Sequence, residues 1–296
     1  MIIWLASYPR SGNTLLRTML KQSMDMDSYS DEPPPKSIGF SKNIERQFGH
    51  LDYAGSWDSF YDLATTSDAI FFVKTHLPPR DQQPVIHVVR DGRRSIFSYW
   101  RYHQSFFPEH SGGLWDLVLG ADYYGDWSEH YEAWNDGARK RLLLRYEDLV
   151  GAPGDAVSKL VNFIGRNDVS SKWINSFEQL NKQNPHFFRQ GRIEWDNPSE
   201  WTKDLNGAFF HLHGELMCAL GYAERSDVDE AREGLTTDMV ELIELVTSIQ
   251  SDRRRLAGIC QDRLDVINAL ERKVGRYGVR NASVLAKWKR LVTWVR

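Results

Sequence analysis

The sequence predicts an α/β fold in which a parallel β-sheet is flanked by helices and followed by a C-terminal helical extension. Short apolar runs such as 70–73 and 85–89 alternate with segments of helical periodicity, as expected for strands buried on both faces. After Gly221 this alternation gives way to apolar residues spaced seven apart. The chain has 296 residues, 41% of them hydrophobic, which suits one α/β domain or two small ones.

The individual elements follow in order from these patterns. Runs rich in strand formers predict strands at 2–7, 70–73, 85–89 and 142–144. Segments of helical periodicity predict helices at 15–20, 91–104, 126–136, 153–164, 171–180 and 206–220. The segment 25–40 contains three consecutive prolines, so we expect a polar loop without regular structure there, because proline lacks a backbone donor.

The segment 222–296 is predicted to be a helical extension of a domain at 1–221. One row of positions spaced seven apart contains Leu242, Ile249, Leu256, Arg263 and Leu270, and a second seam contains Leu245, Ile259, Val266 and Val274. This pattern, interrupted by Asp252 and Arg263, predicts a long amphipathic helix or a coiled coil. A homo-oligomer formed through 242–274 is one functional interpretation of the extension.

The formal net charge of −3 conceals an acidic body and a basic tail. Residues 272–296 contain eight basic and no acidic residues, which leaves 29 basic against 40 acidic residues in 1–271. The tail also contains Trp288 and Trp294, a composition that suits peripheral contact with an anionic membrane surface. The simpler alternative is a solvated helix that packs on the body. We expect no nucleic-acid partner.

Cysteine content and hydropathy favour a cytoplasmic protein. Cys218 and Cys260 cannot form a disulfide framework and belong to no CxxC pair, as in a reducing compartment. No run approaches the ~18 apolar residues that cross a bilayer. Residues 1–6 form an apolar run that is too short for a signal peptide and lacks a basic leader.

The strongest local pattern is a strand, a glycine-containing turn and a helix at residues 2–20. Such a turn presents backbone N–H groups and a helix N-terminus to an anion, which makes the fold P-loop-like. Arg10 adds a permanent charge, and polar groups follow at Ser11, Gly12, Asn13 and Thr14. The full GxxxxGK[ST] pattern is absent, because Asn13 replaces its lysine. Taken alone, the segment could be an ordinary turn with a capped helix.

Two further junctions place chemically useful side chains at the ends of strands. His76 follows the predicted strand 70–73 and could take a proton from a hydroxyl, while Lys74, two positions earlier, could stabilise negative charge. By itself His76 could also be an ordinary loop residue. Arg90 follows the next strand and could form a forked contact with phosphate, with Ser98 two helical turns beyond it.

These segments resemble the nucleotide-binding motifs of sulfotransferases that use 3′-phosphoadenosine 5′-phosphosulfate (PAPS). Residues 8–14 (YPRSGNT) are similar to the 5′-phosphosulfate loop, usually Tyr-Pro-Lys-Ser-Gly-Thr-Thr-Trp, with Leu15 in place of the adenine-stacking Trp. Residues 74–78 (KTHLP) match the element whose His is the general base. Arg90 and Ser98 occupy matching positions of the 3′-phosphate segment, Arg-Asn-x-x-Asp-x-x-x-Ser-Tyr, whereas Arg93 and Arg94 are weaker candidates.

Two more segments extend the resemblance over about 2–221. Residues 188–192 (FRQGR) are similar to the Phe-Arg-Lys-Gly loop that closes over the 3′-phosphate, which carries Arg189 and Gly191 over as contacts. Residues 146–149 (YEDL) match another element of the family, and Tyr146 and Phe177 are candidate adenine contacts, though each could equally be core.

The resemblance implies a cytosolic-type sulfotransferase domain, and we expect a bacterial member. It implies transfer of the sulfuryl group from PAPS, without a metal, to a hydroxyl or amine on a small-molecule, sugar or lipid acceptor. His76 would be the general base, and Arg10 and Lys74 would stabilise charge on the transferring and departing groups. Segments that could line the acceptor pocket, with core packing as the alternative, contain Trp57, Phe60, Tyr61, Trp100, Tyr102, Phe106 and Phe107.

Two other functions remain as alternatives. A P-loop kinase that uses ATP and Mg²⁺ would need a Walker lysine, which Asp91 and Asp148 do not replace. A scaffold organised by the C-terminal helix would leave these ordered motifs unexplained.

Overall fold

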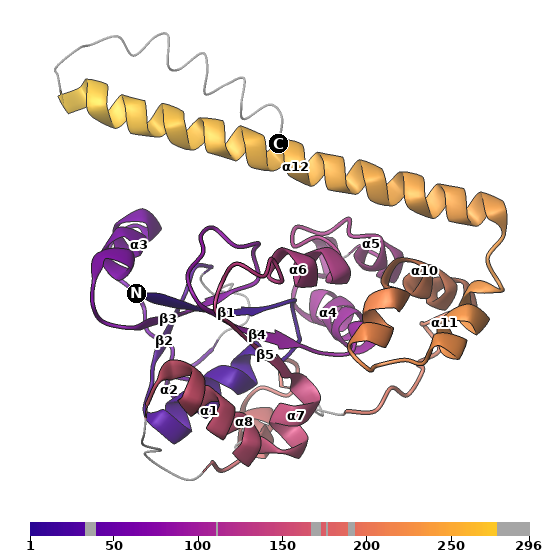
Figure 1. Ribbon diagram of the computed structural model, residues 1–296, viewed down its shortest axis with the longest axis horizontal. Helices are drawn as coiled ribbons and strands as arrows, with labels where there is room; N and C mark the ends of the chain where they lie inside the picture. Colours follow the sequence, from indigo (N-terminus) through magenta and orange to yellow (C-terminus); the bar gives the residue numbers. More distant parts are fainter. Residues whose placement is uncertain (33–39, 111, 167–172, 176, 189–192, 277–296) are drawn as a thin grey trace.

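A parallel five-stranded sheet with helices on both faces forms the centre of the molecule (Figure 1). The computed structural model describes residues 1–32, 40–110, 112–166, 173–175, 177–188 and 193–276. The strands are β1 (Ile2–Ser7), β2 (Ser28–Ser30), β3 (Phe71–Thr75), β4 (Val85–Val89) and β5 (Arg141–Arg145), in the order β2-β3-β1-β4-β5. The prediction of an α/β fold with a parallel sheet is confirmed.

The register of the central strands brings the sequence motifs together. In β1, Ala6 pairs with Thr75 of β3, and Ser7 pairs with Val88 of β4. All three strands run in parallel, so their carboxyl ends lie at the same edge of the sheet. The segments after β1, β3 and β4 therefore meet at the edge where open α/β sheets bind ligands.

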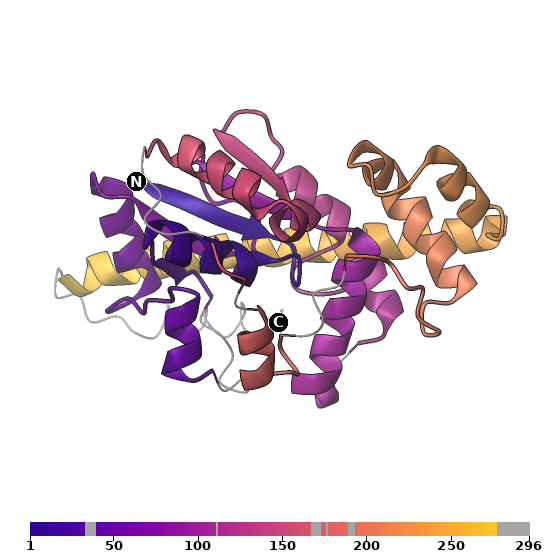
Figure 2. The same cartoon turned by 90° about the horizontal axis from the view of Figure 1, so that it is seen from below.

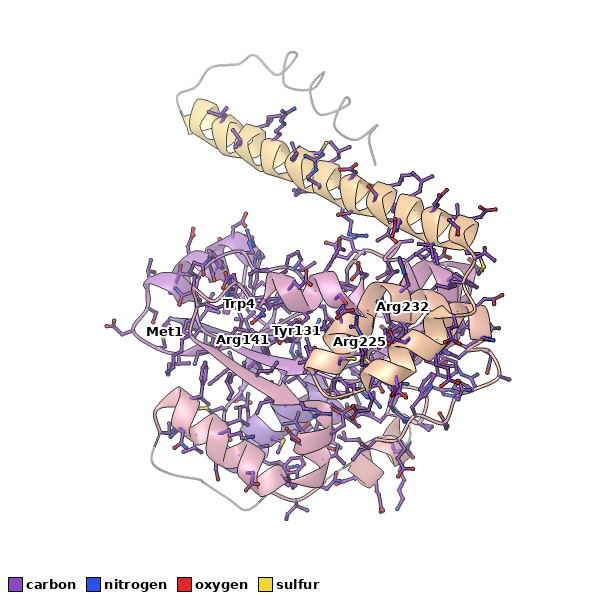
Figure 3. The ribbon with its side chains drawn as sticks, turned by 45° about the vertical axis from the view of Figure 1, so that its right-hand side comes forward. Met1, Trp4, Tyr131, Arg141, Arg225 and Arg232 are labelled. Carbon is purple, nitrogen blue, oxygen red and sulfur yellow. The ribbon has the colours of Figure 1, made fainter. Side chains whose placement is uncertain are left out.

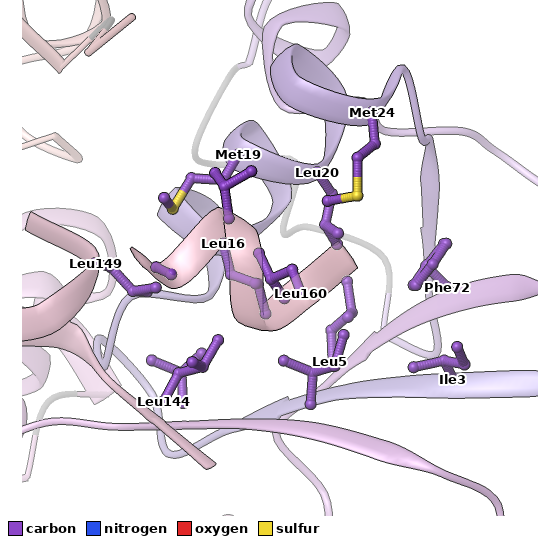
Figure 4. Close-up of a cluster of buried hydrophobic side chains, with 14 of the residues drawn as sticks. Ile3, Leu5, Leu16, Met19, Leu20, Met24, Phe72, Leu144, Leu149 and Leu160 are labelled. Atoms are coloured by element: carbon purple, nitrogen blue, oxygen red, sulfur yellow. The ribbon is translucent and has the colours of Figure 1, made fainter. Parts of the chain in front are cut away.

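One face of the sheet is covered by α1 (Asn13–Met24), α7 (Tyr146–Gly151) and α8 (Pro153–Ile164). Figure 4 shows the core between them, in which Leu5 and Leu144 of the sheet face Leu16 of α1 and Leu160 of α8. Dense packing here fixes α1, and with it the turn that precedes α1.

The other face carries α3 (Trp57–Thr66), α4 (Gly92–Phe106), α5 (Leu114–Val118), α6 (Trp127–Ala133) and α10 (Lys203–Ala219). The remaining elements of the body are α2 (Lys42–Gln47), the 3-10 helix η2 (Pro108–His110) and α9 (Phe177–Gln183). α2 and α9 share a small apolar cluster in which Phe48 packs with Leu180.

Two C-terminal helices complete the described chain. α11 (Arg225–Arg232) packs on α10, where the Arg232 guanidinium donates to the carbonyls of Phe210 at 3.1 Å and His211 at 3.2 Å (Figure 3). α12 (Thr237–Arg276) is one long helix that runs along the length of the body (Figure 2). No helix in the described ranges has both the length and the apolar character needed to span a membrane.

Several predicted boundaries are wrong for identifiable reasons. β2 lies inside the segment 25–40, for which no regular structure was predicted, because Ser-Tyr-Ser has no apolar run and depends on pairing with β3. The helix predicted at 171–180 begins only at Phe177, and 173–175 are not helical. The helix predicted at 206–220 begins at Lys203, because the Thr202 hydroxyl accepts from the Leu205 N–H at 3.3 Å and caps it. Helices α2, α3, α5 and α7 were not predicted, and α11 lies within the predicted helical extension as a separate short helix.

Candidate functional site

A cavity of about 1600 Å³ opens at the carboxyl edge of the sheet. Its walls come from the segments after β1, β3 and β4, and from α1, α4 and the start of α7. Side chains that the sequence separates by more than 130 residues, such as Arg10 and Tyr146, both line it.

The turn after β1 is shaped by two residues with left-handed backbone. Arg10 has φ 64° and Gly12 has φ 107°, and the Ser11 N–H donates to the Tyr8 carbonyl at 3.2 Å. A Cβ atom at Gly12 would lie 2.6 Å from Cδ2 of Tyr146, so only glycine fits under that ring. The turn therefore places the N-terminus of α1 at the cavity, in the geometry that binds anions.

Arg10 extends from this turn across the cavity. Its Nη2 donates to the Phe187 carbonyl at 2.5 Å, and its Nε donates to the Ser98 hydroxyl at 3.4 Å. The guanidinium also lies 4.5 Å from the centre of the Phe187 ring. Two predicted anion contacts, Arg10 and Ser98, are thus brought together from β1 and α4.

The three other polar side chains of the turn have different surroundings. The Ser11 hydroxyl is buried against that of Ser95 at 3.0 Å and does not line the cavity. The Asn13 amide donates to the Leu5 carbonyl at 2.7 Å, which ties α1 to β1, although Asn13 and Thr14 both reach the cavity wall. The Ser11 hydroxyl is therefore not presented to the cavity, and the Ser11 N–H already donates to the Tyr8 carbonyl.

His76 is held in the tautomer that a general base requires. Its Nδ1 lies 2.7 Å from the Ser7 carbonyl oxygen, and a carbonyl can only accept, so Nδ1 donates and Nε2 keeps its lone pair. Burial, and then the nearby Lys74 ammonium, hold the pKa of His76 well below its usual value. The imidazole is consequently neutral at neutral pH and can accept a proton at Nε2.

Two carboxyl groups that the sequence did not single out stand beside Lys74. The Lys74 ammonium lies 3.7 Å from the Glu32 carboxylate, which also accepts from the Tyr124 hydroxyl at 3.1 Å. Burial raises the pKa of Asp31 to about 6, and burial lowers the pKa of Lys74. Both acids directly follow β2, so they could not have been placed at the site without knowing that this short strand exists.

A second cluster of positive charge lies at the start of α4. Arg90 donates from Nη1 to the Arg10 carbonyl at 3.0 Å, and its guanidinium lies 4.2 Å from the centre of the Tyr146 ring. Nε and Nη1 of Arg94 are buried and have no hydrogen-bond partner within the described ranges. Burial, and then the charge of Arg90, lower the pKa of Arg94. Arg93 instead pairs with Asp91 at 2.7 Å and does not line the cavity.

Three predicted contacts fall partly or wholly outside the described residues. Arg189 and Gly191 lie there, and for Phe177 only its place at the start of α9 is described. Tyr146 lines the cavity and also belongs to the buried core, so both of its predicted roles are compatible with its position.

The aromatic side chains around the cavity are only partly those predicted. Tyr102 and Phe107 line it, whereas Trp57, Phe60 and Tyr61 pack with Trp4 on the far side of the sheet. Trp100 and Phe106 are absent from the described lining. Aromatic lining residues that the sequence did not indicate include Tyr99, His103, Tyr124, Trp173 and Phe187. Their helical or loop positions carry no distinguishing pattern.

His130 is a buried neighbour that the sequence also did not indicate. It hydrogen-bonds to the backbone of His76, and burial lowers its pKa to about 3. It therefore supports the loop that carries His76 as a neutral group. In the part of the chain that the structure describes, no group of three or more His, Cys, Asp or Glu residues is arranged to hold a metal ion.

Comparison with known proteins gives a consistent family and fold. The profile of the sulfotransferase domain family matches residues 2–201. Bovine sulfotransferase 1A1 is 26% identical over 181 residues, which cover 55% of this chain and 58% of that enzyme. Rat sulfotransferase 1C2 is 25% identical over 256 residues, covering 72% and 82%. The crystal structure of mouse sulfotransferase SULT7A1 complexed with PAP shares the fold, with a TM-score of 0.50, 19% identity, and coverage of 79% of this chain and 89% of that one.

Proposed function

This chain belongs to the sulfotransferase domain family, and from that premise we propose that its cavity binds PAPS and transfers the sulfuryl group to a hydroxyl or amine of a small-molecule acceptor. The observation that carries the proposal is the tautomer of His76, whose Nε2 is left as an acceptor beside the phosphate-binding turn. The same turn supplies Arg10, and β3 supplies Lys74.

The charges in the cavity fit the anionic groups of the donor. Arg10, Lys74 and the N–H groups from Gly12 to Thr14 would receive the phosphosulfate. Arg90 and Ser98 would hold the 3′-phosphate, with Arg189 and the Gly191 backbone closing over it. Arg94 fits this group as well, because two of its buried nitrogens have no partner within the described ranges and an anion would supply one.

The apolar end of the cavity suits the adenine ring. Tyr146 and Leu15 line it together with Trp173, and Leu15 and Trp173 pack against the same part of the core. Leu15 cannot stack as the usual Trp does, and we propose that Trp173 supplies an aromatic face in its place. Phe177, four residues further on, stays a candidate by resemblance alone.

In the proposed sulfuryl transfer, His76 removes a proton, and Lys74 and Arg10 stabilise negative charge. His76 takes the acceptor's proton at Nε2 as the acceptor oxygen or nitrogen forms its bond to sulfur. The bond from sulfur to the phosphate oxygen breaks, and adenosine 3′,5′-bisphosphate is released. Lys74 and Arg10 stabilise the negative charge on that oxygen, so positioning and fixed charge supply most of the catalysis.

The acceptor end of the cavity combines aromatic walls with acids. Tyr99, Tyr102 and Tyr124 present flat faces, while Asp31 and Glu32 can accept from hydroxyl or amine groups. We propose a phenol, a sugar or a hydroxylated lipid as the acceptor. In the same proposal 1–221 is the catalytic domain, 222–296 is the extension, and the basic tail contacts membranes peripherally from the cytoplasm.

Ligand-dependent melting tests the proposal. Adenosine 3′,5′-bisphosphate at about 100 times its Kd should stabilise the fold by about 2.7 kcal/mol and raise the melting temperature, while ATP with Mg²⁺ should do less. Stabilisation by ATP with Mg²⁺ alone would favour the kinase alternative. Labelled PAPS offered with phenols, sugars and hydroxylated lipids should then identify the acceptor class.

A further inference from the structure

An apolar seam runs along α12 and is exposed to solvent. We define the seam by Leu242, Leu245, Ile249, Leu256, Ile259, Val266 and Leu270, whose exposed fractions lie between 38% and 60%. Large apolar side chains exposed together along one helix face mark an interaction surface more often than a solvated one. The seam spans residues 242–270 of this 40-residue helix, so it extends for about 42 Å at 1.5 Å per residue.

The seam lies on the side of α12 that faces away from the body. The opposite side makes the contacts: Ile243 is only 5% exposed, Thr247 and Gln250 are half-buried, and Arg254 reaches the Gly120 carbonyl and the Glu129 carboxylate. These residues follow one another at intervals of four, three and four, which defines one helix face. In Figure 1 the body lies along one side of α12, and no described element lies along its other side.

Two charged residues stand within the rows that form the seam. Arg263 belongs to the row of Leu242, Ile249, Leu256 and Leu270, and Asp252 belongs to the row of Leu245, Ile259 and Val266. In a parallel pair of such helices each residue faces its own copy. Asp252 would then face Asp252 and Arg263 would face Arg263, and like charges buried together are unfavourable.

An antiparallel pair has the opposite consequence, because there a residue of one row faces a residue of the other row. When Arg263 is set opposite Asp252 of a second copy, the alignment of the whole helix is fixed. Leu256 then faces Ile259, Ile249 faces Val266, and Leu270 faces Leu245. One alignment thus matches both opposite charges and six of the seven seam residues.

We propose that the chain forms an antiparallel homodimer through the seam of α12, with reciprocal Asp252–Arg263 pairs that set direction and alignment. The two bodies would lie on the outer sides of the helix pair, since each body contacts the face opposite the seam. This proposal does not depend on the sulfotransferase activity. Buried charged pairs cost stability but specify register, and the positions of Asp252 and Arg263 suit that role.

Charge exchange in the full-length chain tests the proposal, with the association constant measured by analytical ultracentrifugation. The wild type should sediment as a dimer. Asp252→Arg and Arg263→Asp should each weaken association at least tenfold, because each sets like charges opposite one another, and the double variant should recover it. Ser251→Arg, exposed and off the seam, is the matched control and should not weaken it. A monomeric wild type, or single variants that associate as well as wild type, would overturn the proposal.

Disulfide trapping gives a second readout that does not depend on the charge variants. In a chain with Cys218 and Cys260 replaced by Ser, Leu245→Cys with Leu270→Cys should form a covalent dimer on oxidation. Leu245→Cys alone should not, because in the antiparallel pair the two copies of residue 245 lie about 37 Å apart at 1.5 Å per residue. Efficient crosslinking by Leu245→Cys alone would show a parallel pair and would contradict the proposal.

Discussion

The basicity of His76 depends on two groups around its ring. The Ser7 carbonyl fixes the proton on Nδ1, and the charge of Lys74 together with burial keeps the pKa of His76 below its usual value. The sign follows from the lowered pKa: the ring stays neutral as the pH falls through 6.5 and protonates only below it. We therefore expect kcat/KM to keep its plateau to below pH 6.5, and an acid limb centred above 6.5 would contradict this account.

Replacing His76, the proposed base, should separate catalysis from binding. His76→Ala should lower kcat by at least about 100-fold, because general base catalysis contributes about 10²–10⁴-fold. Its affinity for adenosine 3′,5′-bisphosphate, measured by calorimetry, should stay close to that of wild type, since no phosphate contact is removed. Turnover retained at the wild-type rate would exclude His76 as the base.

Gly12 is the residue on which the shape of the phosphate turn depends most directly. Gly12→Ala would combine a left-handed φ of 107° with a Cβ placed 2.6 Å from the Tyr146 ring. We expect it to lower the free energy of unfolding by about 1–3 kcal/mol, and to weaken bisphosphate binding by about tenfold or more, since 1.4 kcal/mol is tenfold.

The matched control for this change is Gly154→Ala in the first turn of α8. A Cβ atom there meets nothing within 4 Å and the backbone is not left-handed. Urea unfolding should show an effect near zero, or a stabilisation of about 0.4–1 kcal/mol. Equal losses in the two variants would show that neither the Tyr146 contact nor the left-handed backbone of Gly12 determines the result.

At the scale of single residues, the sequence predicted which charged side chains line the cavity better than it predicted their contacts. Arg10, Lys74, His76 and Arg90 could be placed because each lies at or just after the predictable carboxyl end of a strand. Asp31 and Trp173 could not, because their approach to the cavity depends on chain segments without a periodic pattern. The burial of the Ser11 hydroxyl against Ser95 could not be predicted either, because Ser95 lies 84 residues further along the chain.

At the scale of elements, strands with continuous apolar runs were predictable and short surface elements were not. The strand expected at 85–89 coincides with β4, because five buried apolar or neutral residues in a row suit the centre of a parallel sheet. β2 and α5 are three and five residues long, and each is stabilised by tertiary contacts more than by local propensity. Local sequence therefore specifies the centre of the sheet but not its edge.

His213 shows how one side chain joins three elements. Its Nε2 lies 3.2 Å from the Val118 carbonyl in α5 and must donate, while Nδ1 lies 2.8 Å from the Ser128 hydroxyl in α6 and accepts. Burial lowers the pKa of His213 to about 4, so the fold holds it neutral while the unfolded chain protonates it near 6.5. Its contribution to stability is complete above pH 6.5 and is lost as the pH falls toward 4.

The prediction that follows compares wild type with His213→Gln at two pH values. Between pH 7 and pH 5 the wild type should lose about 2 kcal/mol more unfolding free energy than the variant, as linkage gives for one such group. Urea unfolding at both pH values measures the difference and cancels the contributions of other titrating groups such as Asp31. Parallel losses in the two proteins would show that His213 is protonated in the fold.

At the scale of the whole molecule, the sequence predicts both an α/β part and a long helix but does not predict how the helix packs on the body. Heptad spacing predicts a helix and its apolar rows, and α12 does extend from Thr237 to Arg276. Which face packs on the body depends on single contacts such as Ile243 and Arg254, which a periodic pattern does not reveal. The basic tail at 277–296 lies outside the described residues, so its membrane contact stays a prediction.

Arg254 is the side chain that ties α12 to the body at the middle of the helix. It donates to the Gly120 carbonyl and to the Glu129 carboxylate of α6, and a charged hydrogen bond of this kind contributes about 1.5–3 kcal/mol. In Arg254→Ala the amides of α12 should exchange hydrogen at least about tenfold faster, because 1.4 kcal/mol corresponds to tenfold. Arg253→Ala is the matched control, since Arg253 is exposed and contacts Gln250 of its own helix at 3.3 Å. Unchanged exchange in Arg254→Ala would show that Ile243 and its apolar neighbours suffice to dock the helix, and that the seam on its far side is presented to solvent without this polar contact.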